Sequence, residues 1–373
     1  MIPRLFNEDQ TIFTGLGFGG LREAKSCIVK WQLNSGYELE MQYPVTGCRF
    51  PDLKPLNIIA ATTGPEGIVQ PFRIYHTTKP ILGICTVYAR HIAYDLMGHT
   101  IDPFVADGIA EAVAQVQGGA VVQPHAFTIS TELESTTPCV VPAPRSVWSM
   151  LGGQRGSLLD VYGGEWDFDR FSLTQRQRIG NDNGLTVRYG KNLRTLEQDE
   201  NLANTWTAVH PFWLSPDEDV CVTLPEKTIP TGTFDYVRVM VLDLSAEFTE
   251  PPTEEQLRSR TKSYISSNKV GIPDVALTVD FVPLEQTEEY KDRAFLSAIY
   301  KGDTVSVEFP TAYDPDTGEP MAFVTASSRV VETEWLPMED RYKSIRLGKK
   351  RANFVSTMVQ VQKDVSWLLT RRS

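Results

Sequence analysis

Apolar and polar residues alternate through most of this chain, which predicts a protein built mainly of β-strands. The clearest pair, SCIVKWQL at 26–33 and YELEMQY at 37–43, flanks an Asn34–Ser35–Gly36 turn and predicts a hairpin. We expect further strands at 71–76, 81–96, 205–213, 220–224, 234–244, 276–284, 302–309 and 321–335, and the end of the 81–96 segment could turn helical.

Four segments carry helical signals instead. Residues 105–117 have a helical period that two glycines end, and a short helix is expected at 145–151. Residues 251–268 begin with proline and acids and end with basic residues, as helices tend to. At 349–373 an amphipathic helix is expected, with a narrow apolar stripe of the kind that seeks a partner helix. The stripe consists of Phe354, Met358, Val361, Val365 and Leu368.

The segment 162–193 reads as a long two-strand ribbon. Its apolar positions are Trp166 and Phe168, then Phe171 and Leu173, then Leu185, Val187 and Tyr189. The one-residue slip after Phe168 predicts a β-bulge, and NDNG at 181–184 predicts a tight hairpin turn. The segment contains no nucleophile–base pair, so we interpret the ribbon as part of a structural scaffold. We expect its outward Arg176 or Arg178 near a neighbouring subunit or domain.

The charge distribution narrows the class of partner. The 373 residues carry a net charge of −11, but residues 341–373 hold nine Lys and Arg against Asp364, a net charge of +8. The remainder holds 27 basic and 46 acidic residues, a net charge of −19. Such a body is not expected to bind nucleic acid by neutralising phosphates. Its acidic surface either lets DNA slide past or simply aids solubility.

Sequence composition also predicts the compartment. No run reaches the ~18 apolar residues that a membrane helix needs, so no membrane insertion is expected. The N-terminal MIPRLFNEDQ lacks the basic-then-apolar order of a signal peptide. The five cysteines form no CxxC pair, which indicates reduced thiols and synthesis in the cytoplasm.

Three motifs could carry chemistry. His91, Asp95 and His99 would stack on one face of a helix and could bind zinc, but Gly98 and Asp102–Pro103 favour a structural role. GLGFGG at 15–20 matches GxGxxG but lacks the flanking buried strand and long helix of a dinucleotide site, so we interpret it as a loop. DPDTGE at 314–319 lacks the distal acid of a calcium loop and predicts an acidic turn. We therefore predict no cofactor.

Weaker signals leave two binding or enzymatic alternatives open. Glu132 with Glu134, or Asp167 with Asp169, could act as a glycosidase pair, although outward solvated acids are the default interpretation. Tryptophans could line a sugar cleft, although core or interface packing is commoner. These tryptophans are Trp148, Trp166, Trp206, Trp213 and Trp335.

Several stretches together resemble one family. They are NSGYELEMQYPV (34–45), QPFRIY (70–75), ARHIAYDL (89–96), GGEWDFDRFSL (163–173), VRYGKNL (187–193), VALTVDFVPL (275–284), GDTVSV (302–307) and RYKSIRLGKKRANF (341–354). In this order they resemble the phage minor structural proteins that form the tail-tip or baseplate hub. That family includes the N-terminal hub region of tail-associated lysins, the prophage tail endopeptidases.

The resemblance implies an α+β, mainly β fold with two related β-barrel-like hub domains, α+β insertions and a C-terminal helix. The implied domains are a first hub β-domain at 1–100, completed by about 185–215, an inserted α+β domain at 101–184, a connecting α+β domain at 216–275, a second hub β-barrel at 276–348 and the C-terminal helix or linker at 349–373. The ribbon's first strand would close the inserted domain, and VRYGKNL would re-enter the first barrel.

The resemblance further implies a homotrimeric ring at the virion tail tip. The ring would dock on the distal tail protein ring, meet the tape-measure protein and carry a tip or receptor-binding protein. DNA would pass its lumen without specific binding, and the basic C-terminal helix would lie at the axis. A tail-associated peptidoglycan hydrolase and a carbohydrate-binding receptor module are the alternatives. The catalytic region of the lytic relatives lies beyond the part that resembles this chain.

Overall fold

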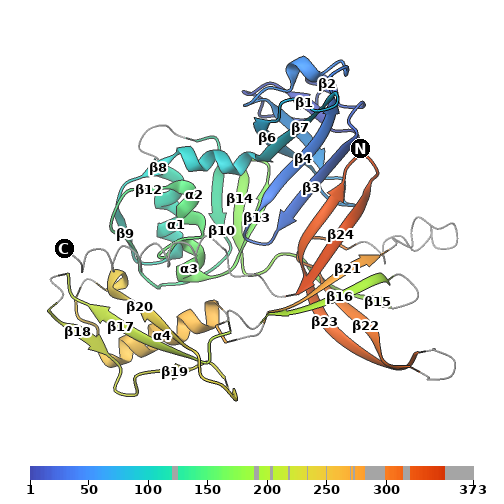
Figure 1. Ribbon diagram of the computed structural model, residues 1–373. Helices are drawn as coiled ribbons and strands as arrows, with labels where there is room; N and C mark the ends of the chain where they lie inside the picture. The colour runs from blue at the N-terminus through green and yellow to red at the C-terminus, as the bar shows by residue number, and fades with distance from the viewer. Residues whose placement is uncertain are drawn as a thin grey trace.

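Strands dominate this protein, and they gather into one large sheet and several small ones (Figure 1). The computed structural model describes residues 1–119, 125–188, 193–201, 205–216, 219–232, 234–248, 250–268, 270–271, 274–281, 299–313 and 320–348. The α+β, mainly β class predicted from the sequence is confirmed. None of the helices in these ranges is long and apolar enough to span a membrane.

The N-terminal part of the large sheet is an antiparallel set that we call the first β region. Its elements are β1 (Arg4–Phe6), β2 (Gly19–Gly20), β3 (Ser26–Gln32), β4 (Tyr37–Pro44), the short 3₁₀-helix η1 (Phe50–Asp52), β5 (Ile58–Thr62), β6 (Val69–Thr77) and β7 (Ile84–His91). The predicted β3–β4 hairpin is confirmed, and Asn34 takes the left-handed conformation of its turn at φ 52°. Alternate residues of β3 are buried, as a sheet with one covered face requires.

The second β region continues the same sheet. Its strands are β15 (Asp182–Arg188), β16 (Leu193–Asn201), β21 (Asp274–Phe281), β22 (Thr304–Tyr313), β23 (Pro320–Leu336) and β24 (Arg341–Gly348). The end of β23 pairs antiparallel with β3, placing Glu332 opposite Gln32 and Trp335 opposite Val29. Both regions also share one hydrophobic core, in which Trp31 belongs to the same cluster as Trp335. The two β regions therefore form a continuous unit.

The inserted region, residues 92–176, packs beside the first β region. Its elements are the 3₁₀-helix η2 (Ile92–Gly98), β8 (Thr100–Ile101), β9 (Phe104–Ala106), α1 (Ile109–Gly118), β10 (Thr128–Thr131), β11 (Cys139–Val141), β12 (Arg145–Ser146), α2 (Val147–Leu151), α3 (Leu158–Tyr162), β13 (Glu165–Asp169) and β14 (Ser172–Arg176). Its hydrophobic core extends into the first β region, because Phe6 and Ile58 belong to the same cluster as Val113. The two predicted helices correspond to α1 and α2.

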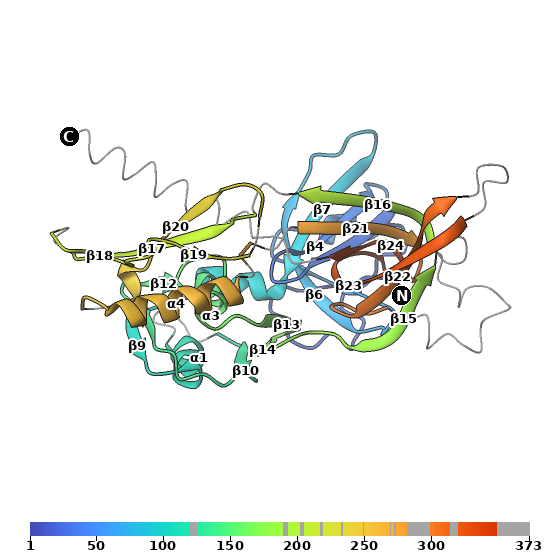
Figure 2. The same cartoon turned by 90° about the horizontal axis from the view of Figure 1, so that it is seen from below.

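The small domain, residues 205–271, has a core of its own. Its elements are β17 (Ala208–Leu214), β18 (Cys221–Thr223), β19 (Ile229–Pro230), β20 (Val239–Asp243), the 3₁₀-helix η3 (Ser245–Glu247) and α4 (Glu254–Ser267). Thr253 and Gln256 form a capping box at the start of α4, which confirms the predicted helix. Figure 2 shows α4 between the small-domain sheet and the helices of the inserted region, and α4 contacts both β17 and α3.

The predicted long ribbon at 162–193 is wrong. β13 and β14 do pair, but the residues between them, Arg170 and Phe171, form a two-residue turn in which Arg170 has φ 53°. This turn, rather than a bulge, causes the slip in the apolar pattern. The NDNG run makes a bulge inside β15, which pairs in parallel with β22, far along the chain. A parallel pairing of this kind has no short-range turn signal.

The expectation that residues 185–215 complete the first β region is corrected for the same reason. β15 pairs with β22 and β16 pairs with β21, so both strands belong to the second β region. Ala208–Leu214 is the central strand of the small domain. The sequence contains the strands, but their partners are set by long-range packing.

Candidate functional site

A polar cluster lies where the first and second β regions meet. The Lys301 ammonium donates to the Tyr37 hydroxyl at 2.6 Å and to the Thr63 hydroxyl at 2.8 Å. It also lies over the Tyr37 ring, 4.6 Å from the centroid. Burial lowers the pKa of Lys301 to about 8. This lysine therefore connects β4 and the residue that follows β5 to the segment that leads into β22.

His91 is part of the same cluster. Its ring stacks on Tyr37 with 4.7 Å between centroids and is 1% exposed. Nδ1 accepts from the Ala93 N–H at 3.2 Å, so Nε2 carries the proton and donates to the Gln70 side-chain oxygen at 3.1 Å. Burial, assisted by the positive charge of Lys301, lowers the pKa of His91 to about 3. A neutral imidazole enclosed on all sides is a packing element.

The hypothetical zinc ligands His91, Asp95 and His99 do not converge. The segment between the histidines is the 3₁₀-helix η2, with His91 and His99 as its caps. A 3₁₀-helix turns by about 120° per residue, so positions four apart lie on different faces. Asp95 instead pairs with Arg73, with 2.9 Å from Nε to each carboxylate oxygen. Among the described residues, no group of three or more His, Cys, Asp and Glu side chains could hold a metal ion.

A largely buried ion pair joins the inserted region to the second β region. The Glu165 carboxylate accepts from both terminal nitrogens of Arg329, at 2.6 and 3.0 Å. Glu165 also accepts from the Ile179 N–H at 2.7 Å, and Arg329 donates to the Ile179 and Gly302 carbonyls. A bidentate pair of this kind fixes geometry as well as adding energy. The sequence pattern did not predict this ion pair. Its one local signal is the Glu165 carboxylate beside Trp166 in a half-buried strand.

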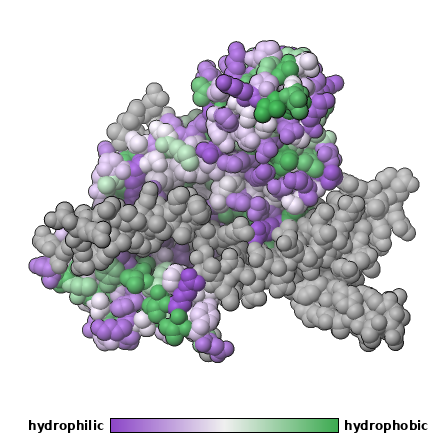
Figure 3. Space-filling view, in the orientation of Figure 1, coloured by the Kyte–Doolittle hydropathy of each residue, from purple (hydrophilic) through white to green (hydrophobic). Residues whose placement is uncertain are grey.

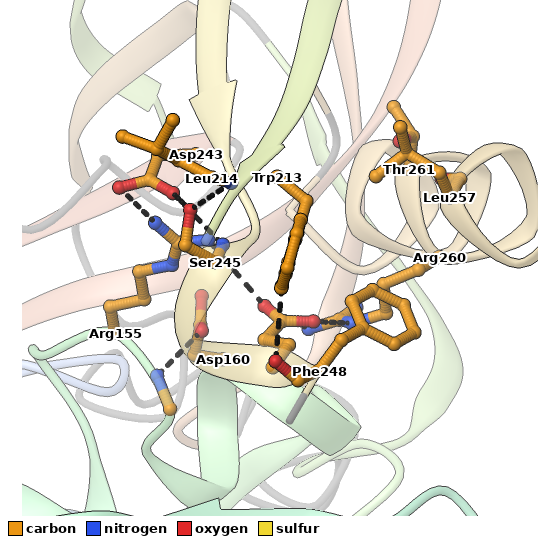
Figure 4. Close-up of polar contacts among 12 residues, drawn as sticks. Arg155, Asp160, Trp213, Leu214, Asp243, Ser245, Phe248, Leu257, Arg260 and Thr261 are labelled. Atoms are coloured by element: carbon orange, nitrogen blue, oxygen red, sulfur yellow. Dashed lines mark hydrogen bonds and ion pairs between the residues drawn. The ribbon is translucent and has the colours of Figure 1, made fainter. Parts of the chain in front are cut away.

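A second charged contact joins the inserted region to the small domain (Figure 4). The Arg155 guanidinium lies 3.6 Å from the Asp243 carboxylate and 3.9 Å from that of Glu247. Arg260 of α4 also binds Glu247, and burial raises the pKa of Glu247. Nearby, the Trp213 indole N–H donates to the Phe248 carbonyl at 3.0 Å. This contact is made by charged side chains, in contrast to the shared hydrophobic core of the two β regions.

The arginines expected at an interface have partners within the chain. Arg176 donates to Asp167 at 3.0 Å and also pairs with Glu132. Arg178 donates to the Thr304 hydroxyl at the start of β22, so it does contact the second β region. Contact of either arginine with another subunit stays a prediction. The candidate interface residues Phe354, Met358, Val361, Val365 and Leu368 lie outside the described residues.

The remaining motifs have structural roles where they are described. GLGFGG forms a loop that ends in β2 beside β1, in which Phe18 N–H donates to the Leu5 carbonyl at 2.7 Å and no helix follows. The acids Glu132 and Asp167 both neutralise Arg176. Three of the tryptophans proposed for a sugar cleft, Trp166, Trp213 and Trp335, are each 2% exposed. DPDTGE at 314–319 lies outside the described residues.

Solved structures of phage tail proteins have a similar fold. The chain is similar to prophage tail protein gp18 from Listeria monocytogenes, with a TM-score of 0.57 and 15% identity over 98% of this chain and 100% of that one. It is also similar to a tail protein from Neisseria meningitidis, with a TM-score of 0.60 and 13% identity over 93% and 96%.

A third similar structure is the 43 kDa tail protein of prophage MuSo2 from Shewanella oneidensis, with a TM-score of 0.53 and 12% identity over 93% of this chain and 98% of that one. No family model and no curated protein matches the sequence. Identities this low establish the fold alone. The chain has the fold of these phage tail proteins, and the resemblance noted from the sequence is confirmed at that level.

Proposed function

We propose that this chain is a structural hub protein of a phage or prophage tail tip. Three copies form a ring that closes the tail tube and connects the distal tail ring to the tip. The observation that carries the proposal is the fold similarity to a prophage tail protein over 98% of this chain and 100% of that chain. Similarity across nearly the whole of both chains favours a shared architectural role over the reuse of one module.

The contacts between regions suit such a role. A ring that closes a tube must keep its shape under load, and partly buried contacts such as Lys301 to Tyr37 and Glu165 to Arg329 join the parts of this chain. The shared core of the two β regions adds rigidity.

The proposed partners are the distal tail ring, the tape-measure protein and a tip or receptor-binding protein, and the proposed location is the virion tail tip. DNA would pass through the lumen without specific binding, because the net charge of −19 outside residues 341–373 repels phosphates.

The oligomeric state tests the proposal. Light scattering of the purified chain should give three times 41.8 kDa, about 125 kDa. A mass of 41.8 kDa that persists when the distal tail ring protein is added would contradict the ring.

The hydrolase alternative has its own test. We expect the chain to leave peptidoglycan intact in a zymogram, because His91 is buried and neutral. Clearing that disappears in His91→Ala would support an enzyme and overturn the purely structural role.

A further inference from the structure

Among the described residues, α4 covers one face of the small-domain sheet and the other face is open. On β17, Val209 and Trp213 are buried, and Val209 packs in one cluster with Leu257 of α4. Because side chains alternate along a strand, Ala208, His210, Phe212 and Leu214 lie on the opposite face, and all four are only half-buried.

The neighbouring strands extend this open face with apolar side chains. Val239 of β20 lies opposite Ala208, and Val241 lies opposite His210. Val239 is 36% exposed and Val241 is 60% exposed. On the other side Cys221 of β18 lies opposite Leu214 and is also exposed. Figure 3 shows hydrophobic surface gathered over these strands. An exposed apolar face of this kind marks an interaction surface.

β24, the last described strand before the C-terminal segment, ends near the linkers of the small domain. β24 runs antiparallel to β21, and its last residue, Gly348, lies opposite Ala276. Ala276 lies only five positions after Gly271, the last residue of the small domain. The chain enters the small domain just after Asn201, which lies opposite Asp274 in the sheet. Residues 349–353 can span roughly 17 Å when extended, so the apolar stripe that follows them can reach the small-domain sheet.

The C-terminal segment also matches the open face in length and complements the small domain in charge. The stripe from Phe354 to Leu368 would be about 21 Å long as a helix, at 1.5 Å per residue. The seven residues of β17 span about 20 Å at roughly 3.4 Å per step. Residues 349–373 hold six Lys and Arg against one Asp, a net charge of +5, and residues 205–271 hold ten Asp and Glu against six Lys and Arg, a net charge of −4. A basic amphipathic segment therefore complements an acidic domain with an open apolar face.

We propose that residues 349–373 pack as an amphipathic helix on the open face of β17, β18 and β20 of the same chain. The stripe covers Phe212, Val239 and Val241, and the basic residues that flank it complement the negative net charge of the small domain. This position differs from the axial one that the resemblance implies, and it does not depend on the trimer, so the mass measurement tests the two ideas separately.

The chain contains a natural reporter and its control. Cys221 lies on the open face, whereas Cys48, the other exposed cysteine among the described residues, lies in the first β region. Thiol labelling of the full chain, followed by peptide mass spectrometry, gives the rate at each site. The packed helix should protect Cys221, and the rate at Cys48 reports the integrity of the rest of the fold.

Two pairs of variants test both sides of the contact. Val361→Asp places a charge in the stripe, and Ser356→Asp places the same charge on the opposite side of the predicted helix. Val241→Asp places a charge on the open face, and Ser263→Asp places it on the solvent side of α4. The first member of each pair should raise the Cys221 rate about tenfold or more, and the second should leave it unchanged.

Two results would overturn the proposal. The first is a Cys221 rate that is equal in the native chain and in all four variants. The second is protection of Cys221 that disappears when the native chain is diluted. A helix supplied by a second copy dissociates on dilution, whereas a helix from the same chain does not.

Discussion

At the scale of single residues, the buried charges connect the parts of this protein. Glu165 and Arg329 are 10% and 21% exposed at their side chains, and the pair joins the inserted region to the second β region. Removal of one partner leaves a buried charge without compensation, and this is the costly way to break such a pair.

Arg329→Leu should therefore lower the free energy of unfolding by about 3–5 kcal/mol in urea titrations. The double variant Glu165→Met, Arg329→Leu should recover part of that loss, since both charges are removed. The matched control is Arg341→Leu, which breaks the exposed pair with Glu339 and should cost less than about 1 kcal/mol. Equal losses for Arg329→Leu and Arg341→Leu would refute the bracing role.

His91 gives a prediction for pH. Its folded pKa is about 3, whereas an unfolded histidine titrates near 6.5. Between these values the unfolded chain binds the extra proton, so stability falls as the pH drops from about 6.5 toward 3. Between pH 7 and pH 5, the free energy of unfolding of the native chain should fall by about 2 kcal/mol more than that of the His91→Gln variant. Parallel losses in the two proteins would show that His91 is not kept neutral by the fold.

Sequence reasoning reached part of this residue-level picture. It favoured a structural role for His91 and Asp95 and allowed a helical end to the strand expected at 81–96, where the chain forms the 3₁₀-helix η2 with the two histidines as its caps. It gave no role to Glu165, Lys301 or Arg329, because their partners lie more than 100 residues away and leave no local pattern.

At the scale of elements, two backbone segments cross closely where β15 and β22 begin. A Cβ on Gly180 would lie 2.2 Å from the Gly302 carbonyl carbon, and Gly180 has φ +75°. The crossing is held by the Asn181 N–H, which donates to the Asp303 carboxylate at 2.8 Å, and by the Thr304 N–H, which donates to the Asn181 carbonyl at 2.9 Å. Only glycine permits this approach.

Gly180→Ala should destabilise the protein by about 1–3 kcal/mol more than Gly67→Ala. Gly67 also has a positive φ, +70°, but nothing lies within 4 Å of its Cβ position, so it carries the conformational cost without the clash. Thermal or urea unfolding of both variants makes the comparison. Equal destabilisation would mean that the crossing tolerates a side chain.

Local elements were the predictable ones. The hairpin at Asn34 and the capped helix α4 follow from alternation, turn residues and capping residues that are adjacent in sequence. β15 was assigned to the wrong partner, because its NDNG run looks like a hairpin turn and its parallel partner β22 is distant. Alternation identifies a strand but not the strand beside it.

At the scale of the whole molecule, the two β regions share one hydrophobic core, and the small domain has a separate core of its own. The resemblance read from the sequence predicted the fold, since tail proteins from three bacteria share it over at least 93% of this chain. It did not predict that β23 pairs with β3, because register across two distant segments depends on the assembled core. The trimer is a property of the surface and remains a prediction.

Images of purified particles test the central claim, the trimeric hub, most directly. Averaged electron micrographs of the full chain, alone or bound to the distal tail ring protein, should show rings with threefold symmetry and a central opening. Single 41.8 kDa particles in both samples, or rings of another symmetry, would contradict the account.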